Sequence, residues 1–313
     1  MYIAKITRSQ GASEYRENSY LMFLKKILNG VNEVVVCRTI IVSVAALAGY
    51  VAFEKNRTLD YQDIYPNGAS QAVQEAFELL GGRAIPIIVN ANDDIFVARE
   101  ALGFKYASLL SDSILNNANA GFKDVVSRGA SAVAQTTKGG VYNFCLISTT
   151  RDDLYASKFT YYHEVGHCAQ AFNSGDYAKK YFPSTEEYSE ALLAVFGNGK
   201  FTKKNADNIA NEALSMYPKE VFADVYAYYH LRTKGLMTDQ QFASTVKAER
   251  HITKHAYKIL YNSKPFIDMA IKNPIEKGER FPDFYVRIMD KSTALIDEPK
   301  TFGKKVVYAL KKS

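Results

Sequence analysis

The stretch YYHEVGHCAQAF, residues 161–172, decides how the fold of this chain is interpreted. His163 and His167 are four residues apart, so a helix places both imidazoles on the same face, one turn apart. Two imidazoles at this spacing can hold one Zn²⁺, and Glu164 can reach a water molecule on the metal rather than the metal itself. This HExxH pattern therefore predicts a zinc site with Glu164 as its general base.

The sequence around this stretch favours a helix that follows directly on a strand. Helical spacing extends over residues 154–173, and Gly175 is a stop signal. Residues 139–149, GGVYNFCLIST, form the clearest strand pattern of the chain. Gly166, beside the second histidine, is small enough to let the helix pack closely against a neighbour. HExxH also occurs by chance, and this context favours a metal site over two surface histidines.

A catalytic zinc ion usually has three protein ligands and one open position, so a third ligand is required. A metzincin would continue with Gly and His where Gln170 and Asn173 stand. The segment PKEVFADVYAYYH, residues 218–230, instead places Glu220 and Asp224 four apart on one helix face. Glu220 can ligate the metal, and Asp224 can accept the free N–H of a ligand histidine.

HEVGH followed by EVFAD resembles the gluzincin zinc metallopeptidases, in which HExxH is completed by a glutamate on a later helix. The run EVFADVYAYYH is similar to the matching helix of CAAX-prenyl-type proteases and of anthrax-lethal-factor-like toxins. The resemblance covers residues 163–230 and implies a zincin-like fold that hydrolyses peptide bonds. It implies that the zinc ligands are His163, His167 and Glu220. It also implies that Glu164 is the general base and that Asp224 is the hydrogen-bond partner of a ligand histidine. The tyrosine or histidine with which many gluzincins stabilise an oxyanion matches no residue here by motif.

Other residues remain candidates for the metal site. Glu212 is a rival third ligand, because thermolysin-like enzymes have Asn-Glu at that place, but Met216 rather than an aspartate stands one turn later. Asp224 itself is the candidate for the third metal ligand that ranks after Glu220 and Glu212. His251 and His255, in HITKH, are also four apart and could bind a metal, although a polar helix face is the simpler interpretation.

Aromatic residues near the second motif are candidates for stabilising an oxyanion, although packing is the simpler role for most of them. They are His230, Tyr217, Tyr226, Tyr228 and Tyr229. Cys168 follows a ligand histidine and is expected to be a small buried residue. With Cys37 and Cys145 it makes three cysteines, too few for a disulfide framework.

Composition excludes several classes of protein. The chain has 313 residues, of which 47% are hydrophobic and 23% charged, as in an ordinary globular protein. A disordered chain, a collagen and a coiled-coil rod are therefore excluded. The net charge of +6 is mild for this length and does not argue for nucleic acid as a partner.

Two regions are predicted: a helical N-terminal segment over residues 1–60, and a zincin-like metallopeptidase domain over residues 61–313. The largely apolar run 34–53 is as long as a membrane span, which needs roughly 20 residues. Arg38 inside it would be costly at mid-bilayer, so a buried helix is favoured and a membrane anchor is the alternative. The polar N-terminus lacks a signal-peptide pattern, which predicts a cytoplasmic protein or one delivered without a signal peptide.

The fold class expected is α+β, with a small mixed sheet and the active-site helix in the first half and a helical second half. RAIPIIVN, residues 83–90, reads as a strand, and Pro86 suggests that it lies at a sheet edge. The strand over residues 141–148 is expected to be the edge with which an extended peptide substrate pairs. Helices are predicted over residues 69–80, 93–116, 154–173, 185–196, 206–216, 218–233 and 238–262.

Two function classes follow. The first is a zinc endopeptidase that acts on a protein or peptide. The second is a non-catalytic structural or binding protein that retains a zincin fold. All the ligand positions are filled, which favours the enzyme.

Overall fold

The computed structural model describes residues 58–90, 99–123, 130–136, 142–149, 154–173, 181–196, 202–251 and 263–296, together with 299, 301 and 303–306. The apolar run 34–53 and His255 lie outside these residues, as does nearly all of the N-terminal segment 1–60. None of the described helices combines the length and the hydrophobicity of a membrane span.

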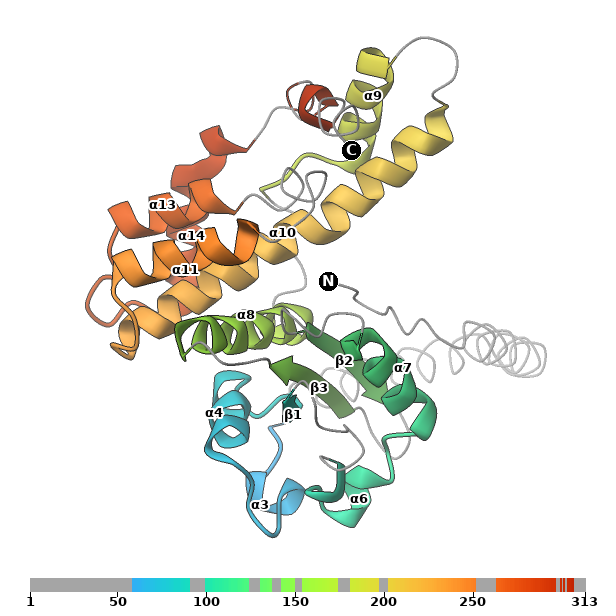
Figure 1. Ribbon diagram of the computed structural model, residues 1–313, viewed down its shortest axis with the longest axis vertical. Coiled ribbons are helices and arrows are strands. Elements are labelled where there is room, and N and C mark those ends of the chain that lie inside the picture. The colour runs from blue at the N-terminus through green and yellow to red at the C-terminus, as the bar shows by residue number, and fades with distance from the viewer. Residues whose placement is uncertain are drawn as a thin grey trace, which may run out of the picture.

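The fold is α+β, as expected, and the sheet is small and mixed (Figure 1). Strands β1 (Ile85–Asn90), β2 (Ala130–Thr136) and β3 (Tyr142–Thr149) lie in the order β1-β3-β2. β1 is parallel to β3, and β2 is antiparallel to it. The helices are α3 (Tyr61–Ile64), α4 (Gln71–Leu79), α6 (Phe104–Ala107), α7 (Asp112–Lys123), α8 (Leu154–Asn173), α9 (Thr185–Phe196), α10 (Lys203–Thr233), α11 (Asp239–His251), α13 (Lys264–Lys272) and α14 (Phe281–Ser292).

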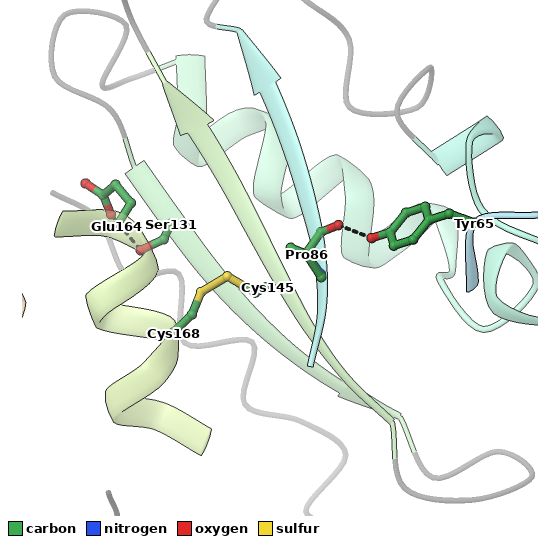
Figure 2. Close-up of a disulfide and its surroundings, with 6 residues drawn as sticks. All are labelled: Tyr65, Pro86, Ser131, Cys145, Glu164 and Cys168. Carbon is green, nitrogen blue, oxygen red and sulfur yellow. Dashed lines mark hydrogen bonds between the residues drawn. A yellow bond between two sulfur atoms is a disulfide. The ribbon is translucent and has the colours of Figure 1, made fainter. Parts of the chain in front are cut away.

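The strand order corrects one prediction and confirms another. The strand predicted over 141–148 as the substrate-binding edge is β3, and it is central because β1 and β2 pair with its two sides. β1 lies at an edge of the described sheet, as Pro86 indicated, and the Pro86 carbonyl accepts a hydrogen bond from the Tyr65 hydroxyl (Figure 2). The other edge strand is β2, which sequence analysis did not predict.

Alternation along β3 divides the core into two clusters. Cys145 and Ile147 face α8 and join the cluster between the sheet and the C-terminal helices. Phe144 and Leu146 face the other way, toward residues of α6 and α7. The sheet therefore lies between two apolar layers, with α8 along one face and the shorter helices against the other (Figure 1).

α8 and α10 cross at very short range. A Cβ atom added to Gly166 would lie 3.0 Å from the Cα of Ala223, which is closer than real Cβ atoms ordinarily come. The absence of a side chain at 166 and the small side chain at 223 therefore let the two backbones meet. This contact brings the HExxH helix against the helix that carries Glu220 and Asp224.

The helices predicted over 206–216 and 218–233 are one continuous helix, α10, with Pro218 inside it. The prediction of a helix start at Pro218 was wrong. Proline removes one backbone hydrogen bond and clashes with the preceding turn, but here both halves of the helix are packed. Ala206 and Ala210 are buried in a cluster with α9, while the second half is buried against α8. Glu220 and Asp224 still lie one turn apart, because that spacing does not depend on where the helix begins.

Helices α8 and α9 have the predicted bounds, 154–173 and 185–196. The helix predicted over 93–116 differs: α6 and α7 occupy residues 104–107 and 112–123, and residues 91–98 lie outside the described part. The helix predicted over 238–262 is α11 up to His251.

A disulfide joins Cys145 of the central strand to Cys168 of α8, and both residues are fully buried (Figure 2). Cys168 is thus buried as expected but not a lone thiol. Sequence analysis missed the pair because a spacing of 23 residues has no characteristic pattern for strand-to-helix bridging. The bond fixes α8 to the sheet one residue after His167.

The variant Cys145→Ala/Cys168→Ala is expected to lower the free energy of unfolding by about 3 kcal/mol, because the cross-link restricts the unfolded chain over a loop of this length. Chemical denaturation of the variant and of wild type measures this loss. Titration of three free thiols in unreduced, denatured wild type would contradict the disulfide.

Candidate metal centre

Three side chains expected as metal ligands converge where α8 and α10 cross. His163 and His167 come from α8 and Glu220 comes from α10, and all three are buried. One ligand atom of each lies within 4.8 Å of the others. The Nε2 atom of His163 lies 3.0 Å from that of His167 and 3.4 Å from Oε2 of Glu220, while Nε2 of His167 lies 3.5 Å from Oε1 of Glu220.

These separations suit a single small cation. Donor atoms about 2.0–2.1 Å from a tetrahedral zinc ion lie roughly 3.4 Å apart, and the observed separations of 3.0 to 3.5 Å agree with that value. Two imidazoles and a carboxylate also bind other divalent transition metals. The donor set therefore fits zinc without selecting it.

Asp224 holds one of the histidines in place. Its Oδ1 lies 2.7 Å from Nδ1 of His163, and its Oδ2 accepts a hydrogen bond from the hydroxyl of Ser263. Asp224 and Ser263 are both fully buried. A carboxylate at Nδ1 directs the Nε2 lone pair of the ring toward a metal, which is the role predicted for Asp224.

Burial and the neighbouring charges act on the pKa of His163 in opposite directions. Burial lowers its pKa, but the adjacent Asp224 and Glu220 carboxylates outweigh burial and raise the pKa to about 10. In the metal-free protein, His163 is thus held as an imidazolium between two carboxylates. A metal ion binds only the neutral ring, so metal binding must release a proton from His163.

Glu164 lies on the side of α8 that faces the sheet. Its Oε2 accepts a hydrogen bond of 2.6 Å from the hydroxyl of Ser131 on β2 (Figure 2). Burial raises the pKa of Glu164 to about 6, although the charge of His163 and the bond from Ser131 oppose the rise. A carboxylate with a pKa this close to neutrality can both accept and return a proton.

Two serines of the site were missed by sequence analysis, and neither has a sequence signal of its own. Ser131 lies in the alanine-rich segment ASAVAQT, which does not have the pattern of a strand. Ser263 precedes the helix KPFIDMAIK, where a serine is expected to cap the helix. Its hydroxyl makes no capping bond and donates to Asp224 instead.

The structure places the helices of two rival ligands, Glu212 and His251, without describing their side chains. Glu212 lies on α10 eight residues before Glu220, about 12 Å along the helix axis. His251 is the last residue of α11, and the structure does not describe its side chain. Asp224, a rival whose side chain the structure describes, touches the centre through His163.

Four of the oxyanion candidates on α10 make contacts with residues other than the three expected ligands. The hydroxyls of Tyr226, Tyr228 and Tyr229 donate to the Leu79 carbonyl, Asp239 and the Glu279 carbonyl, respectively. The His230 ring contacts the rings of Tyr162, Tyr226, Tyr229 and Phe281, and burial lowers its pKa to about 4. Tyr217 packs against Phe182 and Phe266. Packing and hydrogen bonding thus account for His230, Tyr226, Tyr228 and Tyr229.

Asp224→Ala is expected to weaken zinc binding about 10- to 100-fold, the usual cost of losing the hydrogen-bond partner of a ligand histidine. Ser263→Ala should weaken it less, because Asp224 keeps its bond to His163. Titration against a competing chelator measures both. Ser292→Ala is the matched control, since this buried serine donates to the Ile288 carbonyl within α14. Equal affinity in Asp224→Ala and wild type would contradict the role of Asp224.

Comparison of the chain with protein-family models, with curated proteins and with solved structures finds no match.

Proposed function

We propose that the protein is a zinc-dependent endopeptidase with a zincin-like fold. The observation that carries the proposal is the buried convergence of His163, His167 and Glu220 from two crossing helices, next to Glu164 of the same HExxH motif. Asp224 adds the carboxylate that typically accompanies a metal-bound histidine. Burying carboxylates and imidazoles together costs desolvation free energy, which a shared cation or a function would justify.

The side chains of the site divide the reaction between them. His163, His167 and Glu220 would hold the zinc ion, which when bound lowers the pKa of water and polarises the scissile carbonyl. Glu164 accepts a proton from the attacking water as the oxygen forms its bond to the carbonyl carbon. It then returns that proton to the leaving amine as the C–N bond breaks. No net proton is consumed by Glu164 in the cycle.

The substrate is a protein or peptide bound in extended form. An extended peptide can add to a sheet edge through backbone hydrogen bonds. β2 is the edge strand on the Glu164 side of the described sheet, because Ser131 of β2 contacts Glu164 directly. β2 therefore replaces the strand predicted over 141–148 as the proposed binding edge.

Metal analysis combined with a cleavage assay tests the proposal. Purified wild type is expected to hold one zinc ion per chain, and His163→Ala/His167→Ala should hold none. The matched control is His251→Ala/His255→Ala, which removes the other histidine pair and should retain the ion. Mass spectrometry of a proteome-derived peptide mixture should detect new N-termini with wild type only. Zinc binding without any cleavage would favour the structural or binding protein.

A further inference from the structure

A short hydrogen bond joins the HExxH motif to the sheet. The hydroxyl of Ser131 donates to Oε2 of Glu164 at 2.6 Å, and the two residues are 4% and 3% exposed (Figure 2). Bulk solvent is thus nearly excluded from both partners, and a bond to a buried carboxylate is stronger than one at the surface.

The same face of α8 is attached to the sheet twice. Glu164 and Cys168 lie four residues apart, so they share a face of the helix. Glu164 is bonded to Ser131 of β2, and Cys168 is bonded to Cys145 of β3. Ser131 pairs in register with Ile147, two residues along β3 from Cys145, so both attachments come from one face of the sheet. Together they fix the rotation of α8 about its axis.

The bond also distinguishes the two oxygens of the carboxylate. A serine hydroxyl carries a single proton, and here that proton is given to Oε2. Oε1 therefore does not receive the Ser131 hydrogen bond and remains able to accept a proton from water. We propose that Ser131 is a positioning residue, which holds the Glu164 carboxylate in one orientation with Oε1 as the proton acceptor.

The strand itself does not require a hydroxyl at this position. The residues on either side of Ser131 are Ala130 and Ala132, and Ala134 follows in the same strand. An alanine at 131 would keep the backbone pairing of β2 with β3. The Ser131 hydroxyl, which the strand pairing does not require, is the group that contacts Glu164.

This inference rests on the proposed function, and kinetics test it directly. Ser131→Ala is expected to lower kcat about 10- to 100-fold, as loss of a supporting group at a metal site does, with KM and zinc content unchanged. Ser131→Thr keeps the hydroxyl and suits a strand, so it should restore most of kcat. Ser148→Ala is the matched control: an equally buried serine on β3, opposite Ala130, whose kcat should not change. Full kcat in Ser131→Ala, or a loss that Thr does not rescue, would overturn the proposal.

A second measurement separates this inference from the proposed function. In metal-free protein, Ser131→Ala should lower the urea midpoint of unfolding when Glu164 is present. The same change should have a much smaller effect in Glu164→Met, which has a side chain of similar length but no carboxylate. Equal shifts in both backgrounds would show that Ser131 does not hold Glu164. If wild type cleaves no peptide but the two shifts differ, the endopeptidase proposal fails while the Ser131–Glu164 link stands.

Discussion

Glu164→Gln is expected to lower kcat by about 10²- to 10⁴-fold, the usual contribution of a general base, while zinc content stays at the wild-type level. The amide has nearly the same size as the carboxylate and can still accept the hydrogen bond from Ser131, but it cannot take a proton from water. His163, His167 and Glu220 are left unchanged, so the metal ligands are intact. Turnover of a peptide identified by mass spectrometry, measured beside metal analysis, tests both halves of this expectation.

Glu190→Gln is the matched control, because it makes the same change at an exposed glutamate of α9. It should leave both turnover and metal content at the wild-type level. Near-normal turnover in Glu164→Gln would exclude Glu164 as the base. Loss of zinc together with turnover would mean that Glu164 supports the ligands rather than the proton transfer.

The features that local patterns specify were predicted well. The bounds of α8 follow from helical spacing and a glycine stop, and the pairing of His163 with His167 follows from helix geometry alone. The proximity of these histidines to Glu220, by contrast, depends on the tertiary contact between α8 and α10. Gly166 gave the clue to it, because a glycine in a helix interior is costly unless a neighbour needs the space. The structure places Ala223 at that space.

The features that depend on distant partners were missed. β2, ASAVAQT, is rich in alanine, and only its pairing with β3 makes it a strand. Pro218 has the pattern of a helix start, and only packing on both sides keeps it inside α10. The contacts of Ser131 with Glu164 and of Cys145 with Cys168 join segments that sequence cannot place side by side. Among the groups that support the expected site residues, Asp224 was predicted from its helical spacing, whereas Ser131 and Ser263 were not.

Glu220→Ala is expected to reduce zinc affinity by more than the roughly 10- to 100-fold cost predicted for Asp224→Ala. The reason is that it removes a donor atom rather than a group that orients one, and two imidazoles alone leave the ion with more open positions than a protein zinc site normally has. Competition with a chelator measures the loss. Glu220→Gln keeps the side-chain volume and one oxygen, so it should bind zinc more tightly than Glu220→Ala.

Glu212→Ala is the matched control for this prediction, because it removes the same residue type from the same helix about 12 Å away. Its zinc affinity should equal that of wild type. The opposite ranking, with Glu212 essential and Glu220 dispensable, would replace the present assignment with a thermolysin-like one. Equally slight effects at Glu212, Glu220 and Asp224 would show that the centre is not of the gluzincin type. The large gap expected between Glu220→Ala and Glu212→Ala thus decides which glutamate completes the HExxH motif.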